Sequence, residues 1–488
     1  MSMKHIDHVV VLMQENNSFD RVLGWMTPEE HGVDGIGPGF SNPISGPLYA
    51  AGERIFAEPG ANMIPPGAPH QFLDMWAQLW PRGGVANEGY ASVQADYARK
   101  RTRTPEAAAE LVREVMRYHH KDDLPVTRDL ALNFAVADRW FASIASNTWP
   151  NRYFLHMGTS PTGALPLPQI GRRPTIFGRL SEAGLDWRIY VDGPACIYTS
   201  GAVLGEITRT AKARRRRGVS PEEASPLRAY DRFACDVSRA RPLTDDPAQL
   251  AHLAACGIDT TPVPLPAYTF IEPRHLNVGT RQSNNDHHGK HKVWGQRLLA
   301  DLYNTLRADE AVWRRTLLIV LYDENGGYYD HVPAPDAPHP RSARPSGILR
   351  PGSMERYGGR VPALLISPWI RRGAYSQVCD HTSVLAFLEH RFGLAPLSRR
   401  DALADSLADA LCDTYTPGPA RLEPPPPPAE VGVHLAGEAT SELEYDLQRH
   451  LATLDGADGD AELATLTEHE LSRRAEGRAE RLRRGLLV

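Results

Sequence analysis

The chain has 488 residues, of which 42% are hydrophobic and 23% are charged. This composition is typical of a globular protein and excludes a fibrous or fully disordered chain. The 54 Lys and Arg residues nearly balance the 59 Asp and Glu residues, for a net charge of −5. That balance argues against nucleic acid as a partner. We expect the basic run at 212–217 to be a solvated loop or helix end, with an RNA contact as the weaker alternative.

The cysteines and the apolar runs indicate the cellular compartment and whether the chain crosses a membrane. The five cysteines form no C-x-x-C pair, so neither a disulfide framework nor a zinc ribbon is indicated. The apolar stretch at 9–13 is too short for the core of a signal peptide. No run approaches the roughly 18 apolar residues of a transmembrane helix. We therefore expect a cytoplasmic protein with no transmembrane segment.

The predicted strands are continuous apolar runs, which suit a parallel sheet that is covered on both faces. In chain order they lie at 8–13, 187–191, 268–271, 316–322 and 361–367. Amphipathic helical stretches separate them. Alternation of strands with helices predicts an α/β fold with a mostly parallel central sheet.

Two helices are predicted with particular clarity. Thr104 followed by Pro105 resembles an N-cap with proline in the first turn, and this helix is expected to run to about Tyr118. A second helix contains Trp294, Leu298, Leu302 and Leu306, spaced four residues apart on one face.

The chain becomes rich in proline from about residue 416. Five consecutive prolines at 424–428 exclude helix or central strand, so residues 416–440 are expected to be an extended linker. Residues 441–488 are helical by composition and are interpreted as a helical tail, with a disordered end as the alternative. The catalytic domain would then be residues 1–415. The tail could support a homo-oligomer.

Oxygen-bearing side chains follow two of the predicted strands. Glu15 and Asn16 follow the first strand, and Asp323 and Glu324 follow the strand at 316–322. Ligands of open α/β sheets bind beyond the carboxyl ends of strands. Adjacent carboxylates repel each other, and a cation such as Ca²⁺, Mg²⁺ or Mn²⁺ would relieve that repulsion. The alternative is that these acids are helix caps or solvated loop residues.

Thr148 begins the sequence T-W-P-N-R. A hydroxyl on a rigid turn with Arg152 nearby could act as a nucleophile, provided that a base or a metal activates it. The simpler interpretation is that Thr148 is the N-cap of a helix.

Histidines gather at His287, His288 and His291, where they could protonate a leaving group, hold phosphate oxygens or bind metal. His70 is isolated in the sequence. Two Asp-His pairs, at 330–331 and 380–381, raise the possibility that the carboxylate fixes the neighbouring imidazole tautomer.

Five motifs in order resemble the bacterial phosphoesterase family, which holds phosphocholine-preferring phospholipases C and the respiratory-burst-inhibiting acid phosphatase. They are E-N-N-S-F-D at 15–20, T-W-P-N-R at 148–152, N-D-H-H at 285–288, D-E-N-G-G-Y-Y-D-H at 323–331 and D-H-T-S-V-L-A-F-L-E at 380–389. The resemblance covers about residues 6–394. It implies an alkaline-phosphatase-like three-layer sandwich that hydrolyses a phosphate ester.

The resemblance also implies residue roles. One divalent metal ion (Ca, Mg, Mn or Zn) would be held by five residues: Glu15, Asn16, Thr148, Asp323 and Glu324. Thr148 would be the nucleophile and would form a phosphothreonine intermediate. Asn16 and His70 would bind the substrate. Beyond the resemblance, we expect His287 to be the histidine that acts as general acid to the leaving alcohol, and His288 to bind the substrate as well.

Departures from the family pattern bear on the substrate. The family usually has Arg where Asn17 stands and Pro where His288 stands. Its phospholipases also carry C-terminal β domains and an export leader. These differences favour a soluble phosphate mono- or diester over a membrane lipid. A catalytically silent scaffold is the main alternative. A sulfatase is less favoured, because oxidation of threonine would give a ketone rather than an aldehyde hydrate.

Overall fold

The computed structural model describes residues 2–63, 67–102, 104–193, 196–238, 265–275, 277, 281–340 and 353–428. The predicted helical tail at 441–488 and the second part of the predicted linker lie outside these residues.

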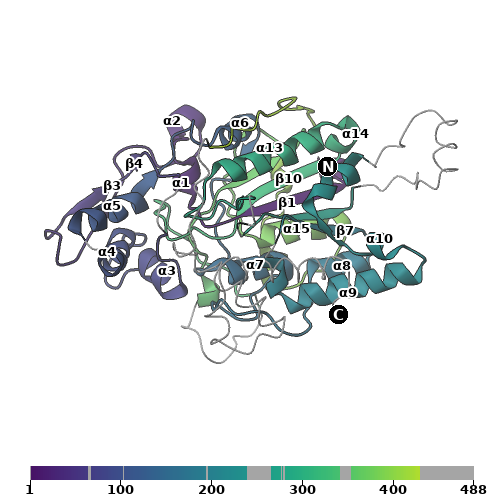
Figure 1. The fold of residues 1–488 in the computed structure, drawn as a ribbon, viewed down its shortest axis with the longest axis horizontal. Helices are drawn as coiled ribbons and strands as arrows, with labels where there is room; N and C mark the ends of the chain where they lie inside the picture. The colour runs from purple at the N-terminus through teal and green to yellow at the C-terminus, as the bar shows by residue number, and fades with distance from the viewer. Residues whose placement is uncertain are drawn as a thin grey trace.

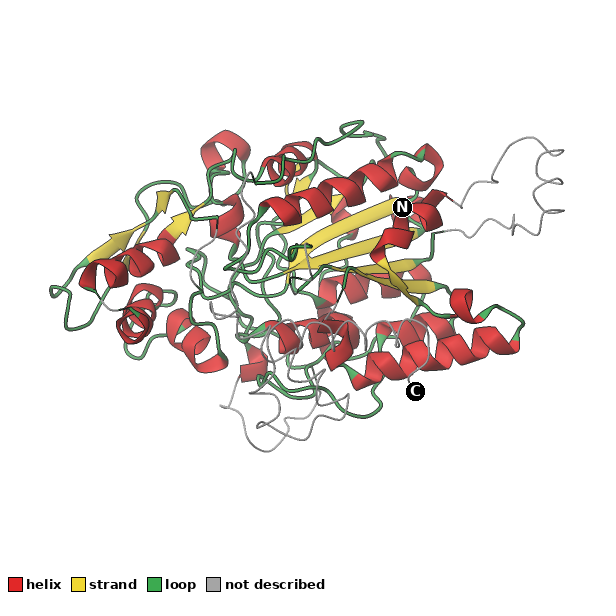
Figure 2. Cartoon of the chain, in the orientation of Figure 1, coloured by secondary structure: helices red, strands yellow, loops and turns green. Residues whose placement is uncertain are grey.

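An eight-stranded sheet forms the centre of the protein (Figures 1 and 2), in the order β12-β6-β11-β10-β1-β9-β7-β8. The strands are β1 (His8–Gln14), β6 (Ala135–Val136), β7 (Trp187–Val191), β8 (Leu227–Ala229), β9 (Tyr268–Glu272), β10 (Thr316–Tyr322), β11 (Ala363–Ile366) and β12 (Gly373–Ala374). All neighbours from β10 to β8 pair in parallel, whereas β11 runs antiparallel to β10 and β6. The predicted α/β fold with a mostly parallel sheet is confirmed.

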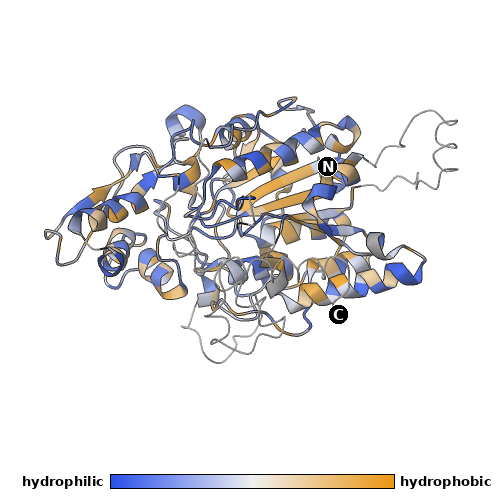
Figure 3. Ribbon diagram, in the orientation of Figure 1, coloured by the Kyte–Doolittle hydropathy of each residue, from blue (hydrophilic) through white to orange (hydrophobic). Residues whose placement is uncertain are grey.

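The sheet interior is apolar on both faces. Every side chain of β10 is buried, and so are those of β7 and β9. Val9 of β1 pairs with Leu317 of β10 on one side and with Tyr268 of β9 on the other. Figure 3 shows these central strands as the most hydrophobic part of the ribbon. Burial on both faces requires a helical layer on each side, which explains the continuous apolar runs in the sequence.

Helices cover the two faces as separate layers (Figure 1). One layer holds α6 (Pro125–Asn133), α11 (Phe233–Ser238), α13 (Val293–Arg307) and α14 (Glu310–Trp313). The other holds α7 (Thr148–Met157), α8 (Ile176–Glu182), α9 (Gly201–Arg216) and α15 (Thr382–Phe392). The shorter helices are α1 (Phe19–Leu23), α2 (Pro28–His31), α10 (Pro221–Ala224) and α16 (Arg399–Leu403). The predicted basic run ends α9, so the expectation of a helix end is confirmed. No described helix has both the length and the apolar character needed to span a membrane.

A lobe extends beyond the carboxyl ends of the strands, at the left of Figure 1. It consists of β2 (Ser41–Pro43), β3 (Arg54–Phe56), β4 (Glu58–Pro59), α3 (Phe72–Leu79), α4 (Tyr90–Arg101), α5 (Pro105–Met116) and β5 (Arg117–Tyr118). Thr104 caps α5 as predicted, since its side chain accepts a hydrogen bond from the backbone N–H of Ala107 at 3.2 Å. The helix is shorter than predicted, because residues 117–118 pair with β4 as a strand.

The described part of the predicted linker, 416–428, is neither helix nor strand, as the prolines require. It lies along α13 instead of projecting freely. Arg297 donates to the carbonyl of Pro425 at 2.7 Å, and Asn304 donates to the carbonyl of Leu422 at 2.8 Å. Residues 416–428 therefore belong to the packed body. The domain boundaries at 415 and 440 stay predictions.

Candidate functional site

Buried carboxylates gather where β1, β10 and β9 end. Glu15 follows β1, Asp323 and Glu324 follow β10, and Glu272 ends β9. All four side chains are fully buried. Neighbouring parallel strands bring their carboxyl ends to one edge of the sheet, which is where ligands of such sheets bind. The structure thus brings together the acidic residues predicted from the sequence and adds Glu272.

Arg152 lies among these carboxylates. Its guanidinium is 2.9 Å from Glu15 Oε1, 2.8 Å from Glu272 Oε1 and 3.3 Å from Asp323 Oδ2. The arginine is buried and extends from α7. One cation therefore connects the ends of three strands. Two of its partners, Glu15 and Asp323, are acids predicted to bind the metal.

The charge of this cluster is not balanced by Arg152 alone. Burial by itself raises the pKa of Glu15, but His275 and Arg152 lower it to about 2. Burial and the Glu15 carboxylate together raise the pKa of Asp323 to about 8. Burial and Asp323 raise the pKa of Glu324 well above its usual value. Full ionisation of these acids therefore requires further positive charge at the site.

Several oxygens at this edge are buried without a hydrogen-bond partner in the described part of the chain. They include Oε2 of Glu15, Oδ1 of Asn16 and Oε1 of Glu324. Leaving such polar atoms unsatisfied costs about 1–3 kcal/mol each. Carboxylate and amide oxygens are the ligands that hard divalent cations prefer. The donor set therefore fits a divalent cation, as the sequence predicted.

Thr148 is the first residue of α7 and is buried. The N-cap position is taken by Asn147, so the interpretation of Thr148 as the cap is wrong by one residue. Thr148 and Arg152 are four residues apart on one helix and so lie on the same face. Because Arg152 contacts Glu15 and Asp323, that face is directed toward the carboxylate cluster.

Two glycines allow the loop after β10 to approach the loop after β1. Gly326 and Gly327 have positive φ values of 62° and 74°. A Cβ on Gly326 would lie 2.4 Å from the carbonyl oxygen of Asn16, and one on Gly327 would lie 2.4 Å from that of Pro69. Asn16 itself has a positive φ of 52°. Such backbone strain in a non-glycine residue is often found at functional sites.

His70, His287 and His288 form a cluster beside the carboxylates. The ring centroid of His70 lies 6.2 Å from that of His287 and 5.1 Å from that of His288. His70 Nε2 is 4.0 Å from Glu324 Oε1, which places the cluster next to the acidic edge. The three histidines predicted to contact substrate are therefore brought together, although His70 comes from the lobe.

The hydrogen bonds of His287 define its tautomer. Its Nδ1 lies 2.8 Å from the carbonyl oxygen of His288, so Nδ1 carries the proton. Burial lowers the pKa of His287 to about 3, so the ring is neutral and Nε2 carries a lone pair. That Nε2 atom is buried and has no partner among the described residues. It is thus able to accept a proton.

Arg360 and His331 hold the first and fourth motifs together. Arg360 donates to Asp20 at 3.0 Å and to Asp330 at 2.7 Å, while His331 Nδ1 is 2.8 Å from Asp20. Asp20 belongs to the first motif, whereas Asp330 and His331 belong to the fourth. This buried network fixes the loops on which the acidic ligands lie.

The suggested Asp-His pairs are not formed by adjacent residues. His331 pairs with Asp20 and Asp34 rather than with Asp330. The Nε2 atom of His381 bonds to the backbone oxygen of Asp323 at 2.7 Å. The adjacent carboxylates have other partners: Asp330 accepts from Arg360 at 2.7 Å, and Asp380 accepts from the backbone N–H of Thr382 at 3.2 Å.

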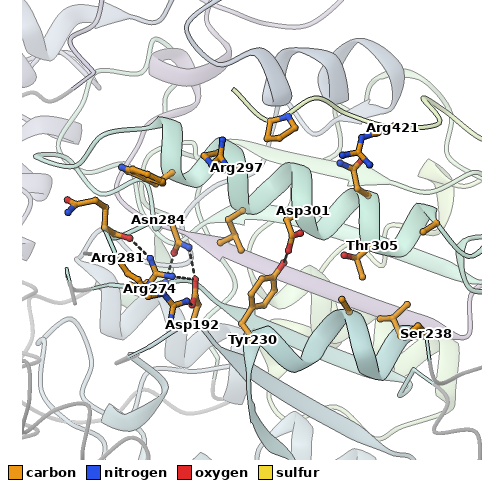
Figure 4. A pocket seen from close by; sticks show the side chains of 18 of the residues that line it. Asp192, Tyr230, Ser238, Arg274, Arg281, Asn284, Arg297, Asp301, Thr305 and Arg421 are labelled. Carbon is orange, nitrogen blue, oxygen red and sulfur yellow. Dashed lines mark hydrogen bonds and ion pairs between the residues drawn. The ribbon is translucent and has the colours of Figure 1, made fainter. Parts of the chain in front are cut away.

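A separate cavity of about 880 Å³ lies between α11, α13 and the segment at 421–424. Figure 4 shows Asp192 paired with Arg274, Arg281 and Asn284 at one end, and Tyr230 bonded to Asp301. None of the predicted catalytic or metal-binding residues lines it. The cavity is therefore distinct from the acidic site.

A comparison with protein-family models matches residues 6–395 to the phosphoesterase family. The chain belongs to this family. The match covers all five motifs, so the predicted membership is confirmed. The protein is therefore a phosphoric ester hydrolase.

Curated relatives of this phosphoesterase include plant and bacterial phospholipases C. Non-specific phospholipase C3 of Arabidopsis thaliana is 30% identical over 92% of this chain and 83% of its own length. Non-hemolytic phospholipase C of Burkholderia pseudomallei is 28% identical over 80% of this chain and 56% of its own length. A solved protein of the alkaline phosphatase superfamily from Vibrio parahaemolyticus matches at 11% identity over 58% of this chain and 63% of that chain, with a TM-score of 0.31. This structural likeness is too low to support an argument about the fold, which is described from the central sheet alone.

Residues that sequence reasoning missed are Glu272, His275 and Cys196. His275 is 3.1 Å from Glu15 and 2.8 Å from Glu272. Cys196 Sγ lies 3.8 Å from Glu15. Glu272 ends a strand that was correctly predicted, so the strand-end rule applied to that third strand would have found it.

Proposed function

We propose that this phosphoesterase is a divalent-metal-dependent phosphodiesterase of the phospholipase C type that acts through a phosphothreonine at Thr148. The observation that carries the proposal is the set of buried, unpartnered oxygens of Glu15, Asn16 and Glu324 at the carboxyl edge of the sheet. The names of the relatives support a diester with a phospholipid headgroup over a monoester. One such relative aligns over 83% of its own length, which supports the same substrate class for this chain.

The cation would be held by Glu15, Asn16, Thr148, Asp323 and Glu324. Bound there, it would lower the pKa of the Thr148 hydroxyl and neutralise charge on the phosphoryl oxygens. Its positive charge is also what the unbalanced acidic cluster requires.

Thr148 loses its hydroxyl proton to solvent and attacks phosphorus, the Oγ1–P bond forms, and the bond from phosphorus to the alcohol oxygen breaks as that oxygen takes a proton from His287. Its position at the start of the ten-residue helix α7 supports this role. The helix N-terminus stabilises negative charge on the phosphoryl group. The side chain of Asn147 makes no capping hydrogen bond to that end. Water then attacks phosphorus and gives one proton to His287, and the Oγ1–P bond breaks to release the phosphomonoester while Thr148 regains a proton from solvent.

His287 donates a proton to the leaving alcohol. In the substrate-free site its Nε2 atom carries a lone pair, so it must first accept a proton from solvent. A phosphate anion bound near the ring favours the imidazolium form and so enables that step. His70 and His288 lie within reach of the same region and would contact equatorial phosphoryl oxygens.

Metal removal tests the proposal. We expect chelation to abolish hydrolysis of p-nitrophenylphosphorylcholine and added Ca²⁺, Mg²⁺, Mn²⁺ or Zn²⁺ to restore it. The metal should also raise unfolding stability, by about 2.7 kcal/mol at 100 times its Kd. Glu324→Gln should remove most of both effects, because it deletes a charged ligand. Exposed Glu182, replaced by Gln, is the matched control. A metal-loaded wild type that is inert on mono- and diester substrates would favour the silent scaffold.

His287→Ala tests the general acid through the leaving group. We expect about a 10²-fold loss on a phosphodiester with an alkyl alcohol, the lower end of the usual range for acid–base catalysis. The loss should be much smaller with p-nitrophenolate, which departs without a proton. Exposed His390→Ala should change neither rate. Equal losses on both substrates would assign His287 to phosphate binding instead.

A further inference from the structure

A second set of metal-binding side chains adjoins the proposed cation site. Cys196 follows β7, His275 follows β9 and Glu15 follows β1, and all three are buried. The Cys196 Sγ atom is 3.8 Å from Glu15 Oε1 and 3.7 Å from His275 Nδ1. His275 Nδ1 is 3.1 Å from Glu15 Oε1. The fold thus brings a sulfur, a nitrogen and an oxygen from distant parts of the chain to one point.

These separations match one face of a zinc tetrahedron. Bonds of about 2.3 Å to sulfur, about 2.0 Å to nitrogen and about 2.1 Å to oxygen, at tetrahedral angles, place sulfur about 3.6 Å from the other two donors. The same bonds place nitrogen about 3.4 Å from oxygen. The observed distances of 3.7, 3.8 and 3.1 Å lie close to these values.

The partners of His275 orient it as a ligand. Its Nε2 atom is 2.8 Å from Glu272 Oε1, which places the proton on Nε2. The amide nitrogen of Asn285 lies 3.2 Å from Nδ1 and donates to the lone pair there, and a cation bound at Nδ1 would replace this hydrogen bond. A carboxylate behind the imidazole is the usual support of a metal-bound histidine. With this tautomer, the Nδ1 lone pair faces the carboxylate oxygen of Glu15, and a cation would turn that repulsion into attraction.

We propose that Cys196, His275 and Glu15 bind a second divalent cation, with Zn²⁺ the best match to one thiolate, one imidazole and one carboxylate. Glu15 would connect the two sites, because Oε1, which also pairs with Arg152, lies at this cluster, while Oε2 is buried without a partner among the described residues. The inference shares Glu15 with the proposed function. Its other two ligands take no part in that function.

A competing arrangement accounts for the same contacts without an ion. A protonated His275 can donate to Glu272 through Nε2 and to Glu15 through Nδ1, with Cys196 as a neutral thiol. This arrangement predicts no thiolate–metal bond. A probe that reports sulfur ligation therefore separates the two.

Cobalt titration of the chelated full-length protein is that probe. We expect two equivalents of Co²⁺ to bind and one of them to give a sulfur-to-cobalt charge-transfer band in the near ultraviolet. Cys196→Ser should lose the band and lower affinity for that equivalent more than about 100-fold, beyond the usual effect of an outer-shell change. Cys379→Ser, at another buried cysteine, should keep both the charge-transfer band and the affinity for that equivalent. Glu324→Gln should weaken only the equivalent without the band.

His275→Asn provides a second variant in case Cys196→Ser does not fold, as judged by circular dichroism. This variant should bind one equivalent of Co²⁺ less tightly, as Cys196→Ser does, and should lack the sulfur-to-cobalt band. A wild type without a sulfur band, or a band that survives in Cys196→Ser, would overturn the second site. Neither result would contradict the first cation site, because binding there is tested separately by the Co²⁺ affinity of Glu324→Gln.

Discussion

Thr148→Ala is expected to lower kcat for phosphodiester hydrolysis at least about 10³-fold, because removal of a nucleophile deletes the step on which turnover depends. KM should change much less, since the other four cation ligands and the histidines remain. Steady-state hydrolysis of bis-p-nitrophenyl phosphate and p-nitrophenylphosphorylcholine by metal-loaded protein measures both quantities.

Two further variants make the Thr148 result specific. Thr148→Ser keeps a hydroxyl at the start of α7 and should retain measurable turnover. Thr208→Ala, whose hydroxyl donates to the Leu204 carbonyl at 3.0 Å on α9, removes the same atoms away from the site. It should leave kcat unchanged. Retention of more than about a tenth of the activity in Thr148→Ala would contradict a nucleophilic role.

Arg152→Gln is expected to destabilise the metal-free protein by about 3–5 kcal/mol, because it leaves Glu15, Glu272 and Asp323 buried without their shared cation. Urea unfolding of chelated protein measures the change. The loss should be smaller after metal addition, since the added cation supplies part of the missing charge.

Arg128→Gln is the matched control for Arg152. Arg128 pairs with Asp122 at 2.7 Å and Asp129 at 2.8 Å, and both carboxylates are exposed. Exposed pairs contribute up to about 1 kcal/mol. If the two variants lost the same stability, the buried arginine would not be the electrostatic centre of the site.

The central strands were predictable because burial on both faces demands uninterrupted apolar runs. The predictions for β7 and β10 match the observed bounds, and those for β1 and β9 differ by one residue at the carboxyl end. β6 and β12 have only two residues each, too few to give a pattern. The antiparallel direction of β11 depends on packing between distant segments, which no local signal records.

The site was partly predictable for a similar reason. Strand ends gave Glu15, Asn16, Asp323 and Glu324, because parallel strands end at one edge of the sheet. The pairing of Arg152 with three carboxylates could not be predicted, because it joins segments more than a hundred residues apart in the sequence. His70 could be assigned only through family resemblance, because its neighbours in the sequence carry no such chemistry. The predicted roles, the helical tail, an oligomer and a cytoplasmic location stay predictions.

The most direct measurement is an acid quench of metal-loaded enzyme during the first turnover, followed by peptide mapping for a covalent phosphoryl group. We predict a phosphorylated peptide that contains Thr148 in the wild type, and its absence from Thr148→Ala and from chelated protein. A phosphoryl group on a histidine such as His287, or turnover at the wild-type rate in Thr148→Ala, would contradict the proposed mechanism.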